Sequence, residues 1–389
     1  MNKKKLSRSS SLQSSVTSVL AALLCILIGL LVGFLVLVAI NPAHAWGDGF
    51  VRIIKVGFHD APYGVGKELA NAAPLIMTGL SVAFAFKTGL FNIGAAGQYT
   101  LGAYGALYCA IMLKLPWFVC LLAAAVLGGL WGAIPGFFKA YFNINEVITS
   151  IMFNWIGLYL VNELIYQNGT GPMYDVRNTR TLNLSKNADF AQSLIPDFGL
   201  NKLFQTNSTT IAIFLAAAVA VLIWVVLNKT TFGYELKAVG LNKNAARYAG
   251  INEKKNIILS MAIAGALAGF GAGLFYLSNV SLWNPLNSTS LPGMGFNGIS
   301  VALLASSNPI GTVFSALFIS HISVGGSFLS TKFYPTEISD LISGIIIYLC
   351  AFSMLFRGKI QSLLFRNAEK TNVNAEPAPA AEKTKKEGK

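Results

Sequence analysis

Long, nearly uninterrupted apolar stretches dominate the sequence. A helix needs about 20 apolar residues to cross the hydrocarbon core, because every backbone N–H and C=O must be satisfied within the segment. Several stretches reach that length, so the pattern predicts an all-α, polytopic membrane helix bundle with about ten transmembrane spans. The predicted spans are 17–40, 71–87, 91–113, 117–138, 146–166, 209–228, 256–277, 291–306, 309–326 and 338–356.

Proline interrupts three places in this pattern. The second and eighth predicted spans are short, and Pro74, Pro292 and Pro309 each have glycines nearby. Because proline removes a backbone donor, these positions predict broken or partly inserted helices rather than smooth cylinders.

Composition and charge support a membrane protein. Hydrophobic residues make up 54% of the chain and charged residues 12%, which is too little polar surface to cover a water-facing exterior. The net charge of +13 does not indicate a nucleic-acid partner, because no soluble domain carries the basic residues. If both termini lie in the cytoplasm, 20 of the 29 Lys and Arg residues lie inside, as the positive-inside rule requires.

The chain divides around these spans. Ala43-His44-Ala45 resembles a signal-peptide cleavage site, but the apolar run from Val16 to Ile40 exceeds the core of about 7 to 15 residues in signal peptides, so we expect an uncleaved first helix. The tail is rich in Pro, Ala, Glu and Lys, a composition typical of disorder. The predicted regions are a basic cytoplasmic N-terminus (1–16), a first helix (17–40), an external loop (41–70), a transmembrane domain (71–356) with an external loop (167–208) and a cytoplasmic loop (229–255), and a cytoplasmic tail (357–389).

The chain lacks an energy source of its own. Ion-coupled carriers commonly place acidic residues or His within their spans, whereas here Glu146, Glu163, Glu337 and Asp340 fall near span ends. His321 is the exception, and we expect it to have a hydrogen-bonded packing role. No Gly-Lys pair has the context of an ATP-binding loop. No Cys pair or His spacing suggests a metal site or cofactor. A transporter of this kind is not itself an enzyme and needs a separate cytoplasmic ATPase.

The loop 229–255 is the best candidate for docking such a subunit. Asn242 can cap a short helix that ends at Tyr248, and Gly250 can supply the left-handed stop. Small alanines leave room for a partner, and Arg and Tyr are common interface anchors. A basic loop that only fixes orientation is the alternative. The predicted docking residues are Asn242, Asn244, Ala245, Ala246, Arg247, Tyr248 and Gly250.

Two further patterns concern packing and the solute path. Glycines at 128, 132 and 136, and at 265, 269 and 273, form rows that let helices approach closely in lipid. The segments 89–106 and 293–316 both place Phe-Asn before glycines, and such paired interrupted segments indicate a substrate path. The alternative is that these amides join helices to each other. The candidate path residues are Phe91, Asn92, Gln98, Phe296 and Asn297.

Four stretches together resemble the permeases of bacterial ABC importers for nucleosides, within the wider group of ribose and branched-chain amino acid permeases. They are FNIGAAGQ (91–98), FNINEVITSIMFNW (142–155), GLNKNAARYAGI (240–251) and GFNGISVALLASSNPIG (295–311). The resemblance covers roughly 70–356 and implies a type II-like permease in a bacterial plasma membrane. It also implies a second, related permease as partner in a heterodimer, two cytoplasmic ATPases and an external substrate-binding lipoprotein.

In this resemblance the segment 240–251 matches the family's coupling helix. One position departs from the pattern, because Ala96 stands where many relatives carry Glu, so no carboxylate role transfers. The leading hypothesis is a nucleoside permease that works by alternating access. The alternatives are a simple-sugar or branched-chain amino acid permease, a secondary transporter or channel that works alone, and a membrane scaffold.

Overall fold

The structure is a computed structural model of the whole chain. It describes residues 2–329, except 60 and 287–289, together with 333–335, 338, 341–342, 344–345 and 348–349. Helices dominate the described residues, whose only sheet is one short two-stranded hairpin. The predicted all-α class is therefore confirmed.

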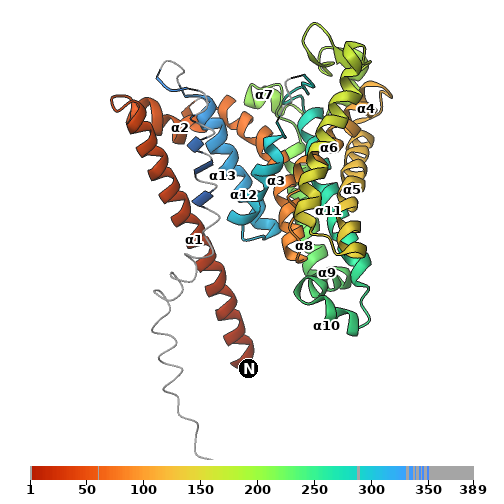
Figure 1. The fold of residues 1–389 in the computed structure, drawn as a ribbon. Coiled ribbons are helices and arrows are strands. Elements are labelled where there is room, and N and C mark those ends of the chain that lie inside the picture. The colour runs from red at the N-terminus through yellow and green to blue at the C-terminus, as the bar shows by residue number, and fades with distance from the viewer. Residues whose placement is uncertain are drawn as a thin grey trace, which may run out of the picture.

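Nine helices form the body of the bundle in the described part of the chain (Figure 1). Seven of them are long and apolar enough to cross a membrane, whereas α4 has 17 residues and α12 only 12. The predicted count of ten spans is not established, because most of the tenth, 338–356, lies outside the described residues. The nine are α1 (Asn2–Ile40), α3 (Tyr63–Lys87), α4 (Ala95–Ile111), α5 (Trp117–Phe142), α6 (Glu146–Tyr166), α8 (Ala212–Lys229), α11 (Glu253–Leu277), α12 (Gly293–Leu304) and α13 (Pro309–Ser327).

Short elements gather at the two ends of the bundle. One end, called the α10 end below, carries α9 (Thr231–Leu241), α10 (Lys243–Tyr248) and the N-terminus of the chain (Figure 1). The opposite end is called the α7 end. It carries η1 (Ala45–Val51), α2 (Arg52–His59), η2 (Gln167–Gly169), β1 (Tyr174–Asp175), β2 (Arg180–Thr181), η3 (Ala188–Ser193) and α7 (Leu200–Phe204).

Helices α5 and α11 pack backbone to backbone through their glycines. A Cβ on Gly265 would overlap the carbonyl oxygen of Gly128 and stand 3.0 Å from Cα of Gly132. A Cβ on Gly269 would stand 3.0 Å from Cα of Gly128. In lipid the hydrophobic effect does not drive helices together, so close van der Waals approach of this kind stabilises the bundle.

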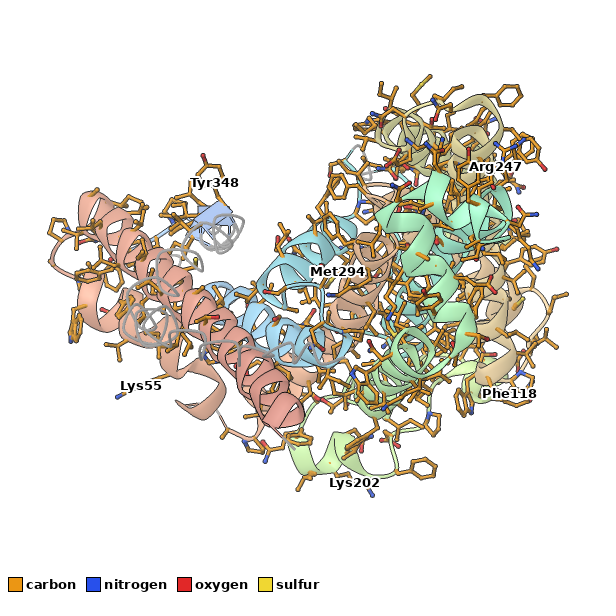
Figure 2. All side chains as sticks on the ribbon, turned by 90° about the horizontal axis from the view of Figure 1, so that it is seen from below. Lys55, Phe118, Lys202, Arg247, Met294 and Tyr348 are labelled. Atoms are coloured by element: carbon orange, nitrogen blue, oxygen red, sulfur yellow. The ribbon has the colours of Figure 1, made fainter. Side chains whose placement is uncertain are left out.

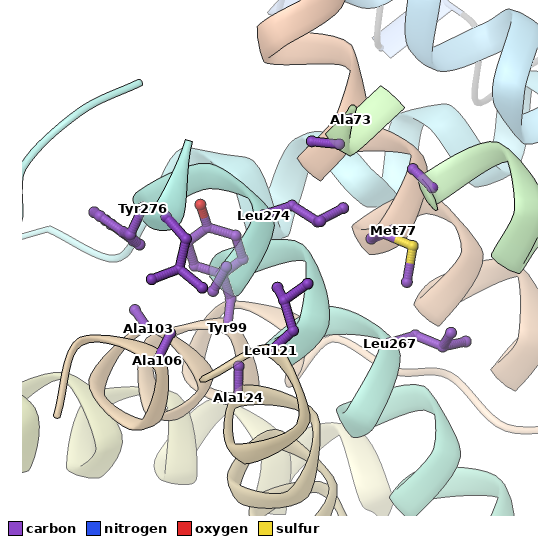
Figure 3. Close-up of a cluster of buried hydrophobic side chains, with 14 of the residues drawn as sticks. Ala73, Met77, Tyr99, Ala103, Ala106, Leu121, Ala124, Leu267, Leu274 and Tyr276 are labelled. Atoms are coloured by element: carbon purple, nitrogen blue, oxygen red, sulfur yellow. The ribbon is translucent and has the colours of Figure 1, made fainter. Parts of the chain in front are cut away.

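The core lies where α3, α4, α5 and α11 meet (Figure 3). Tyr99 of α4 is almost fully buried there, beside Tyr276 of α11, with small alanines around it. Large apolar side chains are exposed on the outside of the bundle, where lipid would cover them. Examples are Leu27, Leu122, Leu130, Ile156 and Phe214.

Helix α3 differs from the prediction in two ways. It begins at Tyr63 rather than at 71, because Lys67 and Glu68 lower the hydropathy of its first turns without ending the helix. Pro74 does not break it, since α3 continues unbroken to Lys87. The Thr78 hydroxyl donates to the carbonyl oxygen of Pro74 at 3.2 Å, which is the bond to the preceding turn that Thr side chains commonly form within helices.

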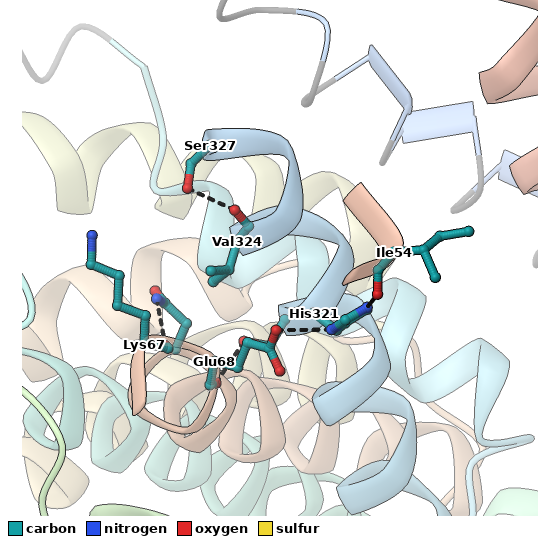
Figure 4. A network of polar contacts seen from close by, with 8 residues as sticks. Ile54, Lys67, Glu68, His321, Val324 and Ser327 are labelled. Carbon is teal, nitrogen blue, oxygen red and sulfur yellow. Dashed lines mark hydrogen bonds and ion pairs between the residues drawn. The ribbon is translucent and has the colours of Figure 1, made fainter. Parts of the chain in front are cut away.

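His321 joins three helices near the α7 end (Figure 4). Its Nδ1 lies 2.8 Å from a carboxylate oxygen of Glu68 on α3, and its Nε2 lies 3.0 Å from the carbonyl oxygen of Ile54 on α2. The neighbouring Ser320 hydroxyl donates to the backbone carbonyl of Glu68 at 2.7 Å. This geometry fits the hydrogen-bonded packing role expected for His321. Glu68 was not among the predicted residues, because it precedes the predicted span.

The glycine contact between α5 and α11 gives a stability prediction. We expect Gly265→Ala to lower the melting temperature of the detergent-purified protein, because a methyl group has no space there and overpacking costs about 1–3 kcal/mol. Gly47→Ala is the matched control, since a Cβ at Gly47 meets no atom within 4 Å. Equal melting temperatures for the two variants would contradict this packing.

Candidate functional site

The segment α9–α10 is a preformed structure at the α10 end. The Asn242 side-chain oxygen accepts hydrogen bonds from the backbone N–H groups of Asn244 and Ala245, both at 3.0 Å, so the predicted helix cap is confirmed. Helix α10 ends at Tyr248, and Gly250 follows with φ +81°, the left-handed stop expected there. The backbone of α10 is therefore held by its own cap and stop, without a partner protein.

Arg247 and Tyr248 project from this segment. The Arg247 side chain is 76% exposed, with the nearest carboxylate, that of Glu253, 3.9 Å away. Tyr248 is 95% exposed, although a large aromatic side chain is normally at least partly buried. Asn244 and Ala245 are exposed beside them. Figure 2, which views the molecule from this end, places Arg247 at the periphery of the bundle.

Ala246 is the exception among the predicted docking residues. It is only 4% exposed and packs inward. The prediction that Ala246 is available to a partner is therefore wrong. Helix α10 packs one side against the bundle, and Ala246 lies on that side, whereas its neighbours in the helix are exposed. It belongs to a buried cluster drawn from α3, the α3–α4 loop, α9, α10 and α11. The cluster is Ala85, Leu90, Val239, Ala246, Ile257, Met261 and Ala264.

A second contact joins α9 to the loop between α3 and α4. Gly89 has φ +76°, and a Cβ on it would overlap the backbone of Gly240. Conversely, a Cβ on Gly240 would overlap the backbone of Thr88 and Gly89. With no side chain between them, a displacement of α9 would be passed directly to the α3–α4 loop.

The first candidate path residues are Asn92 in that loop and Gln98 in α4. The amides of Asn92 and Gln98 form a reciprocal pair: Asn92 donates to Gln98 at 2.7 Å, and Gln98 donates to Asn92 at 3.0 Å. Asn92 also donates to the Ser81 hydroxyl at 2.9 Å, and both amides are buried. These bonds correspond to the alternative in which the amides join helices. A direct role in the solute path remains a prediction.

Asn154 of α6 belongs to the same network, although it was not among the predicted site residues. Its side-chain oxygen accepts from the backbone N–H of Gly97 at 2.8 Å, and its amide donates to the carbonyl oxygen of Ile93 at 3.0 Å. Asn154 thereby satisfies backbone groups at the start of α4, which has no side-chain cap of its own. The available signal was an amide within an apolar span, a feature that Asn162 of the same helix shares.

The two interrupted segments meet, as a shared path requires. A Cβ on Gly295 of α12 would overlap the backbone of Ala96 in α4, and a Cβ on Gly298 would stand 2.7 Å from Thr78 of α3. Both α4 and α12 begin beside this contact, which brings two positive helix ends together. Ala96 is itself buried at this contact.

The remaining candidate path residues lie near this contact. Phe91 is half-buried and stacks on Phe86, with ring centroids 5.1 Å apart. Phe296 is 38% exposed. Asn297 is half-buried, and its side chain forms no hydrogen bond among the described residues. Figure 2 shows Met294, from the same turn of α12, between the α1 side and the α11 side of the molecule. Asn297 is thus the candidate with unused hydrogen-bonding capacity.

Comparisons with known proteins identify the family. Residues 66–351 match the family model described as the permease component of the branched-chain amino acid transport system. The guanosine ABC transporter permease protein NupP of Bacillus subtilis is 35% identical over 311 residues, which is 76% of this chain and 83% of that protein. The nucleoside permease protein NupB of Lactococcus lactis is 32% identical over 364 residues, covering 91% of this chain and 93% of NupB.

A third relative carries a different substrate name. The glucose ABC transporter permease protein TsgB13 of Haloferax volcanii is 31% identical over 339 residues, which is 82% of this chain and 84% of that protein. No solved structure matches the chain. The family match includes α9, α10 and both interrupted segments. The chain therefore belongs to the family of branched-chain amino acid transport system permease components, as a multi-pass membrane permease subunit.

Proposed function

We propose that this chain carries nucleosides across the bacterial plasma membrane as one permease subunit of an ATP-driven importer. The observation that carries the proposal is the similarity to NupB along 91% of the chain, together with the similarity to NupP. The named substrates of these two relatives are nucleosides and guanosine. Simple sugars are the second candidate substrate class, because TsgB13 is named for glucose.

The α10 end is proposed to face the cytoplasm and bind the ATPase. Basic residues favour the cytoplasmic side of a membrane protein, and this end carries a group of them. The capped α10 presents Arg247 and Tyr248 without burying either, which suits an interface anchor. The basic side chains in and around α9–α10 are Lys229, Lys237, Lys243, Arg247, Lys254 and Lys255.

The proposed coupling route runs from α10 into the bundle. A push on α10 moves Ala246 and its buried cluster, and the Gly240–Gly89 contact passes the motion to the loop that holds Asn92. The loop continues into α4, whose Ala96 touches Gly295 of α12. Alternating access would follow if these contacts move as a unit, because packed interfaces switch between arrangements rather than deform.

The other proposed partners follow from the resemblance to nucleoside importers. A second, related permease would complete the solute path, and an external substrate-binding lipoprotein would deliver the solute at the α7 end. Both termini are proposed to be cytoplasmic, and the structure places the N-terminus on the same side as α10 (Figure 1).

Solute uptake tests the substrate. In proteoliposomes that contain the complete importer with its binding lipoprotein outside and ATP inside, we expect radiolabelled guanosine to accumulate. Unlabelled adenosine or cytidine in about 100-fold excess should suppress the accumulation, whereas ribose, glucose and leucine should not, because NupP and NupB are named for guanosine and nucleosides. Suppression by glucose but not by nucleosides would favour the second candidate.

Replacement of the exposed anchors tests the ATPase interface. The double variant Arg247→Glu, Tyr248→Ala should insert normally but lose at least about tenfold in ATPase co-purification and guanosine uptake, because hot-spot truncations typically cost 2 kcal/mol or more. Lys55→Glu, an exposed substitution on α2 near the opposite end, is the control and should leave both unchanged. Normal uptake in the double variant would contradict the proposal that α10 binds the ATPase through these two side chains.

A further inference from the structure

The β1–β2 hairpin helps to form a basic pocket at the α7 end. The pocket has a volume of about 470 Å³ and lies between the hairpin, the following chain and the residues after α11. One carboxylate faces three cationic side chains in it. The charged residues of the pocket are Asp175, Arg177, Arg180 and Lys186, and Leu282 and Asn284 also line its wall.

The cationic side chains of this pocket form no ion pair within 4.0 Å in the described part of the chain, although Asp175 and Arg177 attract each other at longer range. No carboxylate lies within ion-pair distance of Arg177, Arg180 or Lys186 there. Asp175 lies opposite Arg180 in the hairpin register, yet its oxygens accept from the Asn178 amide at 2.6 Å and from the Arg177 backbone N–H at 3.0 Å. The hydrogen bond from Asn178 lowers the pKa of Asp175, so this carboxylate stays ionised and committed to the turn.

The pocket is rigidly attached to the bundle. The backbone N–H of Thr181 donates to the carbonyl oxygen of Trp283 at 2.9 Å, and the Trp283 backbone N–H donates to the Thr181 hydroxyl at 3.2 Å. The Trp283 indole donates to Asn162 of α6 at 2.9 Å. Behind the pocket, the Asn279 amide donates to the Ser185 hydroxyl at 3.0 Å. A partner would therefore meet a preformed surface and lose little entropy in ordering it.

The position of the hairpin favours a protein as the occupant rather than a lipid. Figure 1 shows the segment after α6 standing beyond the ends of the neighbouring helices, on the side opposite α10. Val176, at the tip of the hairpin, is 66% exposed next to these charges. An exposed apolar residue with a basic surround is a common composition for a protein interface, whereas a lipid headgroup would lie nearer the helix ends.

We propose that this hairpin pocket docks carboxylate side chains of the external solute-binding protein that delivers the solute to the importer. The inference rests on the proposed function, which places the α7 end outside the cell. Unpaired positive charges at an interface rim raise the association rate and orient the partner. The wall residues Leu282 and Asn284 lie on the chain that leads from α11 towards α12, so the docked protein contacts that connection directly.

Charge reversal tests this surface in the complete importer reconstituted in proteoliposomes. For Arg177→Glu, Arg180→Glu we expect the concentration of solute-binding protein that gives half-maximal uptake to rise at least about tenfold, with maximal uptake and ATPase co-purification retained. The difference from wild type should shrink as salt is raised towards about 1 M, where the Debye length falls to about 3 Å. Lys202→Glu on α7, exposed at the same end, is the matched control and should shift this concentration little.

A peptide probe gives a second measurement on the wild type and on the double variant. Octaglutamate added outside should inhibit wild-type uptake and should inhibit the double variant much less, whereas octalysine should inhibit neither. An unchanged half-maximal concentration, or an equal shift in Lys202→Glu, would overturn the proposal. A shift seen only in vesicles with anionic lipid would assign the pocket to a lipid phosphate and would also overturn it. Uptake that needs neither ATP nor the binding protein would instead refute the proposed function.

Discussion

Close approach of helix backbones through glycine is the constraint on which this fold depends. In hydrocarbon the backbone polar groups are satisfied within each helix, and helices associate mainly by packing surfaces that fit closely. Gly265 and Gly128 bring α11 onto α5, and Gly298 brings α12 onto α3. Around these contacts lie small side chains and a few large buried ones such as Tyr99, whereas the lipid-facing side chains are long and apolar. The bundle is consequently stiff where helices cross.

A glycine contact of the same kind also lies outside the spans, and the coupling proposal depends on it. Gly89 and Gly240 leave no side chain between the α3–α4 loop and α9, so the two segments cannot move independently without opening a gap. The loop in turn holds Asn92, whose amide is paired with that of Gln98, and Asn154 fixes the backbone around them. A buried amide network that is fully paired rigidifies its surroundings, because breaking one partner leaves the other unsatisfied.

Much of this arrangement could be predicted from local sequence signals. The Asn242 cap and the Gly250 stop are short-range features, and the structure has both. The glycine rows of α5 and α11 also meet as their spacing indicates. Three-dimensional neighbours were harder to predict. Nothing near Ala246 in the sequence shows that it packs inward, and nothing near Glu68 shows that His321, 253 residues away, contacts it. The prediction of a break at Pro74 was wrong, because α3 is buried on both sides of this proline and packing stabilises the helix there.

The central claim is that motion imposed on α9–α10 reaches the solute path through the Gly240–Gly89 contact. Its most direct test is Gly240→Ala in the complete importer, with guanosine uptake and ATP hydrolysis measured in the same proteoliposomes, and with Leu241→Ala, an 89% exposed neighbour on α9, as control. The account predicts that Gly240→Ala keeps its ATPase and hydrolyses ATP but transports at least about tenfold less guanosine per ATP, while Leu241→Ala matches wild type. An unchanged ratio of guanosine to ATP in Gly240→Ala would contradict the account.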